Sequence, residues 1–168
     1  LYRKACALPD ELMDGLRALM AAQVPELGRL ARGRAGPLNI EGLTWDTARA
    51  RLIFGVRTPQ DQRHALVVTA TLRDRTAPLS NQNLLFDPSV RRLDLGGLTV
   101  RGLGYDPVAR RVLIIGGPAG DGGGAWRVFD WDGDAGSAVR DVRQLSSGGK
   151  PEGISRIVLG GRTRTLIV

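Results

Sequence analysis

The chain has 168 residues, of which 42% are hydrophobic and 24% are charged, and its formal net charge is +7. Only two of its 24 basic residues are Lys, so 22 are Arg, and these are spread along the whole chain with acids between them. Because nucleic-acid binding needs basic residues gathered on one face, we expect no nucleic-acid partner. The single Cys, Cys6, excludes an internal disulfide and a multi-cysteine metal site. No apolar run reaches the roughly 18 residues of a membrane-spanning helix, so we expect no membrane partner.

Residues 9–32 are the stretch with helical periodicity. Pro9 and Asp10 favour a helix start, and Pro25 is expected to break the helix. Four apolar residues fall on one helical face, namely Leu12, Leu16, Leu19 and Met20. We interpret residues 1–37 as an N-terminal helical segment that packs against the sheets; a partner-binding helix is the alternative.

From Leu38 onward the sequence predicts strands separated by turn residues. Residues 73–90, which are rich in Arg, Asn, Pro and Ser, predict a long loop, and such loops often carry function. The expected strands are 39–46, 51–57, 64–72, 91–94, 98–105, 111–116, 125–131, 138–144, 152–158 and 163–168.

One motif recurs along the chain. Glu41-Gly-Leu-Thr-Trp-Asp46 returns as Arg101-Gly-Leu-Gly-Tyr-Asp106 and again as Glu152-Gly-Ile-Ser155, each time followed by an apolar run that opens with Arg. A strand, a turn and a second strand at this spacing are typical of a radial β-repeat. We predict an all-β fold in which residues 38–168 form part of a β-propeller, about two complete blades and the start of a third. A propeller closes with about four to eight blades, so we expect the remaining blades to come from a longer chain or from further chains.

Several motifs in this order carry a family resemblance: Ile40-Glu-Gly-Leu-Thr-Trp-Asp46, Leu98-Thr-Val-Arg-Gly-Leu-Gly104, Ile115-Gly-Gly-Pro118, Phe129-Asp-Trp131 and Lys150-Pro-Glu-Gly-Ile154. The chain resembles domain-of-unknown-function family 3616, a bacterial β-propeller group without an established activity. The resemblance covers residues 38–168 and implies the propeller fold but no reaction.

The recurring position held by Glu41, Arg101 and Glu152 is the candidate site. Innermost strands line the channel of a propeller, so one position repeated across blades forms a ring. With Arg57 at a neighbouring strand end, these residues predict binding of a polar or anionic small molecule at the channel mouth. The alternative is that their side chains only tie neighbouring blades together through salt bridges.

A second resemblance points to a metal. Glu41-Gly-Leu-Thr-Trp-Asp46 is similar to the opening motif of calcium-dependent gluconolactonase-like propellers, where the glutamate ligates the ion. This resemblance implies a lactonase or esterase-like hydrolase with calcium held by Glu41 and Glu152, although Arg101 would place a positive charge at the same ring. A non-catalytic interaction scaffold using residues 73–90 is a further alternative. No complete catalytic motif is present, so we assign no catalytic residue.

Three further patterns have simpler structural interpretations. Gly120-Asp-Gly-Gly-Gly-Ala125 matches a dinucleotide-binding fingerprint, but a strand is expected after it where a helix is needed. Four acids have the spacing of a calcium loop, yet we predict a strand ending in an Asp-Gly turn; they are Asp130, Asp132, Asp134 and Asp141. His64 has no assignable nucleophile partner, and we interpret it as a strand-start residue.

Overall fold

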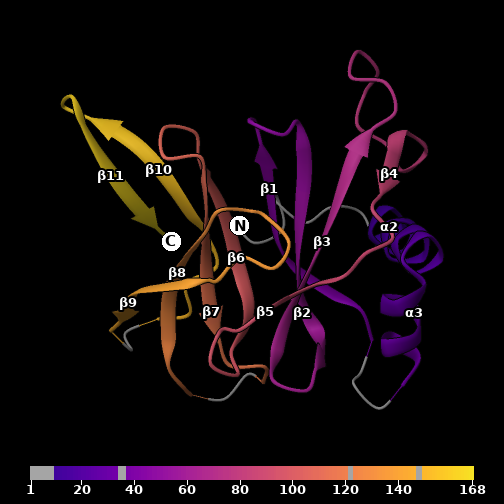
Figure 1. Cartoon of the computed structure of the whole chain (residues 1–168), viewed down its shortest axis with the longest axis horizontal. Coiled ribbons are helices and arrows are strands. Elements are labelled where there is room, and N and C mark those ends of the chain that lie inside the picture. The colour runs from indigo at the N-terminus through magenta and orange to yellow at the C-terminus, as the bar shows by residue number, and fades with distance from the viewer. Residues whose placement is uncertain (1–9, 34–36, 121–122, 147–148) are drawn as a thin grey trace.

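The computed structural model describes residues 10–33, 37–120, 123–146 and 149–168, and Cys6 lies outside these ranges. Within these ranges, two helices precede a series of antiparallel strands (Figure 1). No helix in the described ranges is both long and apolar enough to cross a membrane. The elements are α2 (Asp10–Gln23), α3 (Pro25–Arg32), β1 (Asn39–Asp46), β2 (Arg51–Asp61), β3 (His64–Leu72), η1 (Asn81–Asn83), β4 (Leu84–Phe86), β5 (Arg91–Leu93), β6 (Thr99–Asp106), β7 (Arg111–Gly117), β8 (Trp126–Trp131), β9 (Arg140–Leu145), β10 (Ile154–Leu159) and β11 (Arg162–Ile167).

The helical stretch divides where the sequence predicted. Helix α2 ends at Gln23 and α3 begins at Pro25, whose fixed φ suits a first helical position and whose missing N–H is not needed there. Met20, Val24 and Leu27 are fully buried against the first sheet.

Strands β1 to β5 form the first sheet, which we call the first blade. The order is β1-β2-β3-β4, and β5 pairs with the other end of β3. The expected loop over residues 73–90 is therefore partly wrong, because it contains the 3-10 turn η1 and the strand β4. Asn83 orders the connection: its Oδ1 accepts the Asp74 N–H at 2.8 Å and its Nδ2 donates to the Asp74 carbonyl at 2.7 Å. The connection is thus ordered by side-chain hydrogen bonds rather than by an alternating apolar pattern. The sequence therefore contained no signal for a strand here.

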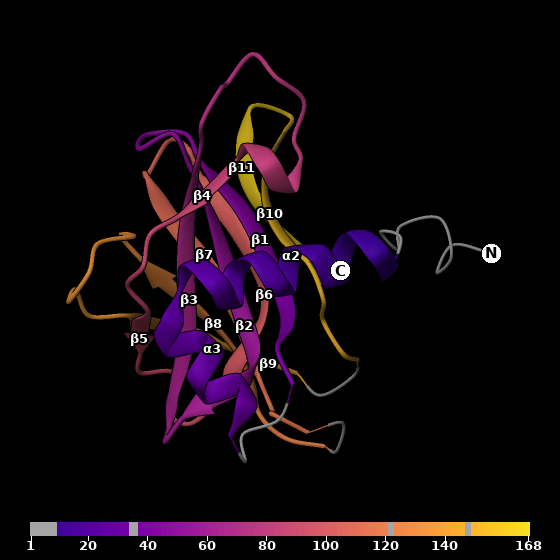
Figure 2. The ribbon, with the colours of Figure 1, turned by 90° about the vertical axis from the view of Figure 1, so that its right-hand side faces the viewer.

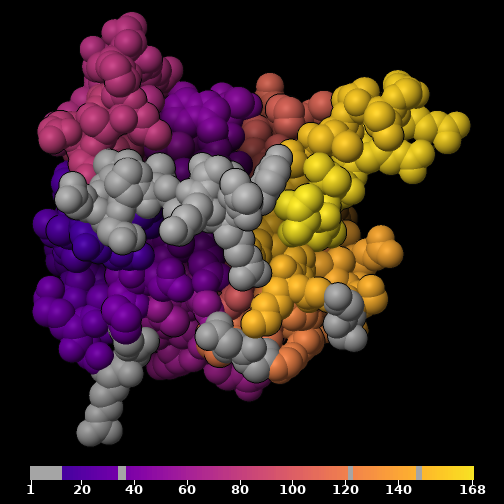
Figure 3. All heavy atoms as spheres, turned by 180° about the vertical axis from the view of Figure 1, so that it is seen from behind, coloured from indigo at the N-terminus to yellow at the C-terminus, as the bar shows by residue number. Residues whose placement is uncertain are grey.

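Strands β6 to β9 form a four-stranded antiparallel meander, which we call the second blade, and β10 pairs with β11 in a third unit. The third unit repeats the first two strands of the other blades. In Figure 3 its hairpin, in yellow, stands out from the body of the molecule.

The three units pack against one another through the faces of their sheets, and the first strand of each unit lies next to the first strand of the following unit. β1 contacts β6, and β6 contacts β10. Alternate residues of β2 and β3, including Ile53 and Val67, pack against Ile114, Phe129 and Trp131 of the second blade. On the opposite face of the second blade, a further cluster contains Leu113, Ile115, Trp126, Val128 and Ile154. Successive meanders whose first strands adjoin are blades, so the chain is an all-β part of a β-propeller with two blades and the start of a third.

The helices cover the remaining face of the first blade (Figure 2). Leu52 and Phe54 of β2 face them, whereas the equivalent residues of the second blade, Val112 and Ile114, face the first blade. The pair α2–α3 therefore occupies the place that a preceding blade would take. The predicted packing of the N-terminal helical segment against the sheets is thus confirmed for α2 and α3.

Candidate functional site

Glu41 lies at an irregularity of β1. Ile40 and Gly42 lie opposite consecutive residues of β2, Val56 and Gly55, so Glu41 has no partner of its own in the ladder. This two-against-one register is a β-bulge, which bends the strand and turns a side chain out of the regular alternation.

Arg101 has the same position in β6. Val100 and Gly102 lie opposite consecutive residues of β7, which leaves Arg101 as the extra residue. The repeated position found in the sequence is therefore a repeated bulge at the inner edge of both blades.

The third copy shows the same hydrogen-bond pattern. The N–H groups of Glu152 and Gly153 both donate to the Val168 carbonyl, at 2.7 and 3.0 Å, and the Val168 N–H donates to the Gly153 carbonyl at 3.0 Å. Two consecutive donors on one acceptor are typical of a bulge. The side chain of Glu152 is exposed, and it has no ion pair among the described residues.

Glu41 joins the two blades through its carboxylate. Its Oε2 lies 2.9 Å from Arg101 Nε, and its Oε1 accepts from Arg57 Nη1 at 2.7 Å. The Asn39 amide also donates to Oε1, at 3.2 Å. The structure thus brings three of the four predicted site residues together and leaves Glu152 outside the contact. We name Glu41, Arg57 and Arg101 the bulge cluster.

Arg101 is the most buried member of the bulge cluster, with 5% of its side chain exposed. Its guanidinium lies 5.2 Å from the centroid of the Trp126 ring, in a cation–π contact, and Nη1 donates to the Pro118 carbonyl at 3.3 Å. Arg57 Nε donates to the next carbonyl, that of Ala119, at 3.1 Å. The Nε–H of Arg101 is not aligned on Glu41 for a hydrogen bond, so this contact is an ion pair without that bond. We did not predict Trp126 as part of the site, because its place in the sequence shows only that it begins a strand.

The model of the family described as "Protein of unknown function (DUF3616)" matches residues 21–160, which is more than half of the chain. The chain belongs to this family. No curated protein matches it. Among solved structures, the chain is similar to the β-propeller domain of Cps50 (Swd1) from Myceliophteria thermophila, with a TM-score of 0.29 and 9% sequence identity. The alignment covers 70% of this chain and 44% of the solved chain.

The bulge cluster of this DUF3616 chain does not have the composition of a calcium site. Hard cations take several oxygen ligands. The described residues contain no group of three or more His, Cys, Asp or Glu side chains that could hold a metal, and two guanidinium groups contact the Glu41 carboxylate. The four acids with calcium-loop spacing do not form a metal-binding group either, and Asp132 accepts hydrogen bonds from Ser137 and from the Asp134 N–H. Asp130 pairs with Arg111 and Arg140, Asp134 with Arg49, and Asp141 with Arg127.

The glycine-rich segment of this family member is followed by β8, which begins at Trp126. A helix N-terminus, which the dinucleotide fingerprint requires, is therefore missing at this point. His64 begins β3 opposite Asp61, in agreement with its interpretation as a strand-start residue.

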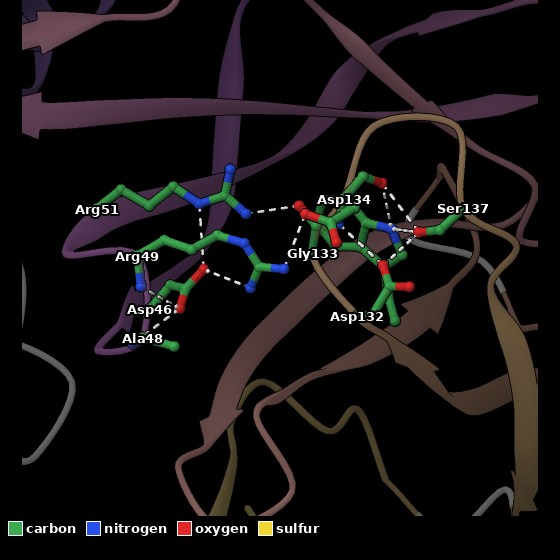
Figure 4. A network of polar contacts seen from close by, with 9 residues as sticks. Asp46, Ala48, Arg49, Arg51, Asp132, Gly133, Asp134 and Ser137 are labelled. Atoms are coloured by element: carbon green, nitrogen blue, oxygen red, sulfur yellow. Dashed lines mark hydrogen bonds and ion pairs between the residues drawn. The ribbon is translucent and has the colours of Figure 1, made fainter.

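A second polar network links the blades at the turn after β1 (Figure 4). Asp46 is fully buried. Its Oδ1 accepts the N–H groups of Ala48 and Arg49, both at 3.1 Å, and its Oδ2 lies 3.1 Å from Arg51 Nε. Arg51 Nη2 then reaches the second blade, where it donates to the Gly133 carbonyl at 2.5 Å.

The motif is repeated at the end of β6. Asp106 Oδ1 accepts the N–H groups of Val108 and Ala109 at 3.0 and 2.9 Å, and its Oδ2 pairs at 2.9 Å with Arg156 of β10. Both aspartates close the repeated sequence motif, so the signal for this network was present in the sequence. The contacts that join the units, from Arg51 to Gly133 and from Asp106 to Arg156, could not be predicted, because their two ends lie far apart in the chain.

We expect the stability of this family member to fall at acid pH through Asp132. Burial alone would raise the pKa of its carboxyl, but hydrogen bonds from the Ser137 hydroxyl and the Asp134 N–H outweigh burial, together with the charges of Arg111 and Arg49. The folded pKa is therefore below the usual value of about 3.9. Such a group stabilises the fold above its unfolded pKa, and its contribution is lost as pH falls from about 4 through the folded pKa.

Urea unfolding between pH 7 and pH 2 measures this contribution. Ser137→Ala removes a hydrogen bond to Asp132, so the variant should be less stable than the parent at pH 6, and the difference should become smaller as the pH falls through the folded pKa of Asp132. A part of the difference should remain at every pH, because Ser137 also accepts the Nε1–H of Trp131. Curves that stay separated by the same free energy at every pH would contradict a role for Asp132 ionisation.

Proposed function

We propose that this DUF3616 domain binds a small anion, a carboxylate or phosphate, at the bulge cluster. The observation that carries the proposal is Arg101, a nearly buried guanidinium whose donors are incompletely used. A guanidinium has five N–H donors. Among the described residues, Arg101 makes one hydrogen bond, to Pro118, and one ion pair, with Glu41.

The side chains of the bulge cluster suit an anionic ligand. Two guanidinium groups, those of Arg57 and Arg101, meet at one carboxylate, that of Glu41. A planar guanidinium can hold a carboxylate or phosphate through two parallel hydrogen bonds. The cation–π contact with the Trp126 ring helps to hold the Arg101 guanidinium in place, and a side chain that is already ordered loses less conformational entropy on binding.

The geometry favours an anion over the calcium-dependent hydrolase. A cation at Glu41 would lie beside two guanidinium groups, and its repulsion from them would oppose the attraction of one carboxylate. We therefore assign no calcium cofactor to the bulge cluster. We also assign no catalytic residue, because the hydrolase alternative depends on that metal.

Thermal-shift screening against acetate, citrate, phosphate and calcium tests the proposal. We expect Arg101→Lys to keep the charge but weaken anion binding by about 1–3 kcal/mol, the value of one charged hydrogen bond. This is about 5- to 150-fold in affinity. Arg127→Lys is the matched control, because Arg127 pairs with Asp141 while 41% exposed on the surface and should leave binding unchanged.

Glu41→Gln distinguishes the two ligand classes. It should affect anion binding less than Arg101→Lys, since it removes a competing negative charge. The proposal is overturned if calcium stabilises the protein, this stabilisation disappears with Glu41→Gln, and Arg101→Lys has no effect. Such a result would favour the metal-dependent hydrolase.

A further inference from the structure

A pocket of about 290 Å³ lies between the first two blades. One wall is the segment that connects the blades, residues 94–98, and the other is the face of β8 and β9 that packs against the first blade. No member of the bulge cluster is among the described residues that line this pocket. We call it the inter-blade pocket.

The buried part of the pocket lining is apolar. Leu95 and Phe129 are 1% and 4% exposed and belong to the core between the blades. Leu98 and Val139 are partly buried against the same core. Ligand sites typically combine an apolar lining with a few polar groups, and those for drug-sized molecules measure about 300–1,000 Å³. The inter-blade pocket therefore suits a smaller molecule with an apolar part.

Arg127 and Asp141 supply polar groups to the second-blade wall. Trp126 and Val128 pack toward the third unit and Phe129 toward the first blade, so Arg127 shares the face of Phe129 by the alternation of a strand. Arg127 Nε lies 2.8 Å from Asp141 Oδ2, in an ion pair without an aligned hydrogen bond. Among the described residues, the two terminal nitrogens of Arg127 have no hydrogen-bond partner.

A second carboxylate, that of Asp94, lies on the opposite wall. The Leu98 N–H donates to the Leu95 carbonyl at 3.3 Å, and Gly96 and Gly97 between them have φ of +66° and +87°, as in a type I′ turn. Asp94 Oδ1 accepts the Gly96 N–H at 2.9 Å, whereas Oδ2 has no partner within the described ranges. The turn thus fixes Asp94 at the pocket and leaves one of its oxygens unused.

We propose that the inter-blade pocket binds a free α-amino acid with an apolar side chain. The carboxylate of the ligand would accept hydrogen bonds from both terminal nitrogens of Arg127, whose planar fork matches a carboxylate. The ammonium group would donate to Asp94 Oδ2. The side chain would contact Phe129 and Val139. The lining thus offers a cation, an anion and an apolar surface, which are the complements of the three parts of an amino acid.

The charges of the lining favour a zwitterion over a simple anion or a simple amine. Two carboxylates, those of Asp94 and Asp141, accompany one guanidinium among the described lining residues. An anion without an ammonium group would meet both carboxylates, and an amine without a carboxylate would lie near the charge of Arg127. Acetate, citrate and phosphate therefore suit the bulge cluster and not this pocket, so Arg127→Lys remains a control for them.

Titration with L-valine, L-leucine and L-phenylalanine, followed by NMR of the backbone amides, tests the proposal. Binding should shift the amide signals of Gly96 and Gly97, which lie in the turn beside Asp94. L-leucinamide lacks the carboxylate and N-acetyl-L-leucine lacks the ammonium group. Each should bind at least about tenfold more weakly than L-leucine, because one set of charged hydrogen bonds is lost. Glycine should also bind more weakly, because it has no apolar side chain to bury.

Asp94→Asn tests the ammonium contact in the protein. The amide keeps an oxygen that can accept the Gly96 N–H, so the turn is retained while the charge is removed. L-leucine should bind at least about tenfold more weakly to this variant. Asp134→Asn is the matched control and should leave binding unchanged, because Asp134 is 60% exposed and is not a lining residue of the pocket. If Asp94→Asn does not fold, the two leucine derivatives still decide the question on the parent protein.

Arg101→Lys separates the inter-blade pocket from the bulge cluster, where an amino acid could bind through its carboxylate alone. L-leucine binding that is lost with Arg101→Lys and kept with Asp94→Asn would place the ligand at the bulge cluster and overturn the inter-blade site. The site is also overturned if none of the three amino acids shifts the Gly96 and Gly97 amides. Binding of L-leucinamide or N-acetyl-L-leucine as tight as that of L-leucine would contradict recognition of a zwitterion.

Discussion

Replacing Asp46 by Ala is expected to lower the free energy of unfolding by about 3–5 kcal/mol, because it removes one partner of a buried ion pair. The carboxylate is fully buried and holds two backbone N–H groups of its turn. It also neutralises Arg51, whose side chain is only 13% exposed. Without Asp46, these donors and this charge stay buried without their acceptor.

Asp134→Ala is the control for this experiment. Asp134 pairs with Arg49 in the same network, but it is 60% exposed, and exposed ion pairs contribute about 0–1 kcal/mol. Urea unfolding followed by tryptophan fluorescence, at one protein concentration, compares the two variants. Equal losses of stability would show that the burial of Asp46 does not determine its contribution.

Gly104→Ala is expected to separate the third unit from the second blade. A Cβ atom at Gly104 would lie 2.2 Å from the Ile154 carbonyl oxygen, which belongs to the backbone and cannot rotate away. Overpacking of this kind costs about 1–3 kcal/mol. Because the clash lies between β6 and β10, we expect amides of the β10–β11 ladder to lose protection from exchange while those of β2 and β3 keep theirs.

Alanine substitutions at two other glycines serve as comparisons for Gly104→Ala. Gly123→Ala should have no effect on the ladder, since a Cβ there meets no described atom within 4 Å. Gly102→Ala should have an intermediate effect, because its Cβ would lie 3.1 Å from the Glu152 carbonyl oxygen. Unchanged protection of β10 and β11 in Gly104→Ala would mean that the third unit is held by contacts elsewhere.

Most strands could be predicted from the sequence because their signals are local. The alternating apolar residues and turn residues around 39–46 and 64–72 match β1 and β3 to the residue. Strand β4 was missed because Leu84–Phe86 is too short to show alternation and depends on the loop bonds of Asn83.

The candidate site was predicted in part for a similar reason. The repeat identified the position of Glu41 and Arg101, and the bulges at both residues explain why that position recurs. The sequence contained no information on the Trp126 ring beside Arg101, since the two residues belong to different strands of the second blade. The role of Glu152 stays a prediction, because a site residue needs partners from neighbouring elements. Its side chain is exposed and belongs to a unit with two described strands.

The sequence by itself determined most of the strands and the equivalence of Glu41, Arg101 and Glu152, because periodicity and repeats are properties of residues close together or regularly spaced in the chain. Only the tertiary structure decided which charges meet. Glu41 and Arg101 are 60 residues apart, and they form a pair because two bulges turn their side chains toward the seam between stacked blades. It also decided that α2 and α3 cover the first blade where another blade would pack. Apolar burial has no direction, so a narrow apolar stripe on a helix can cover a sheet as another sheet does.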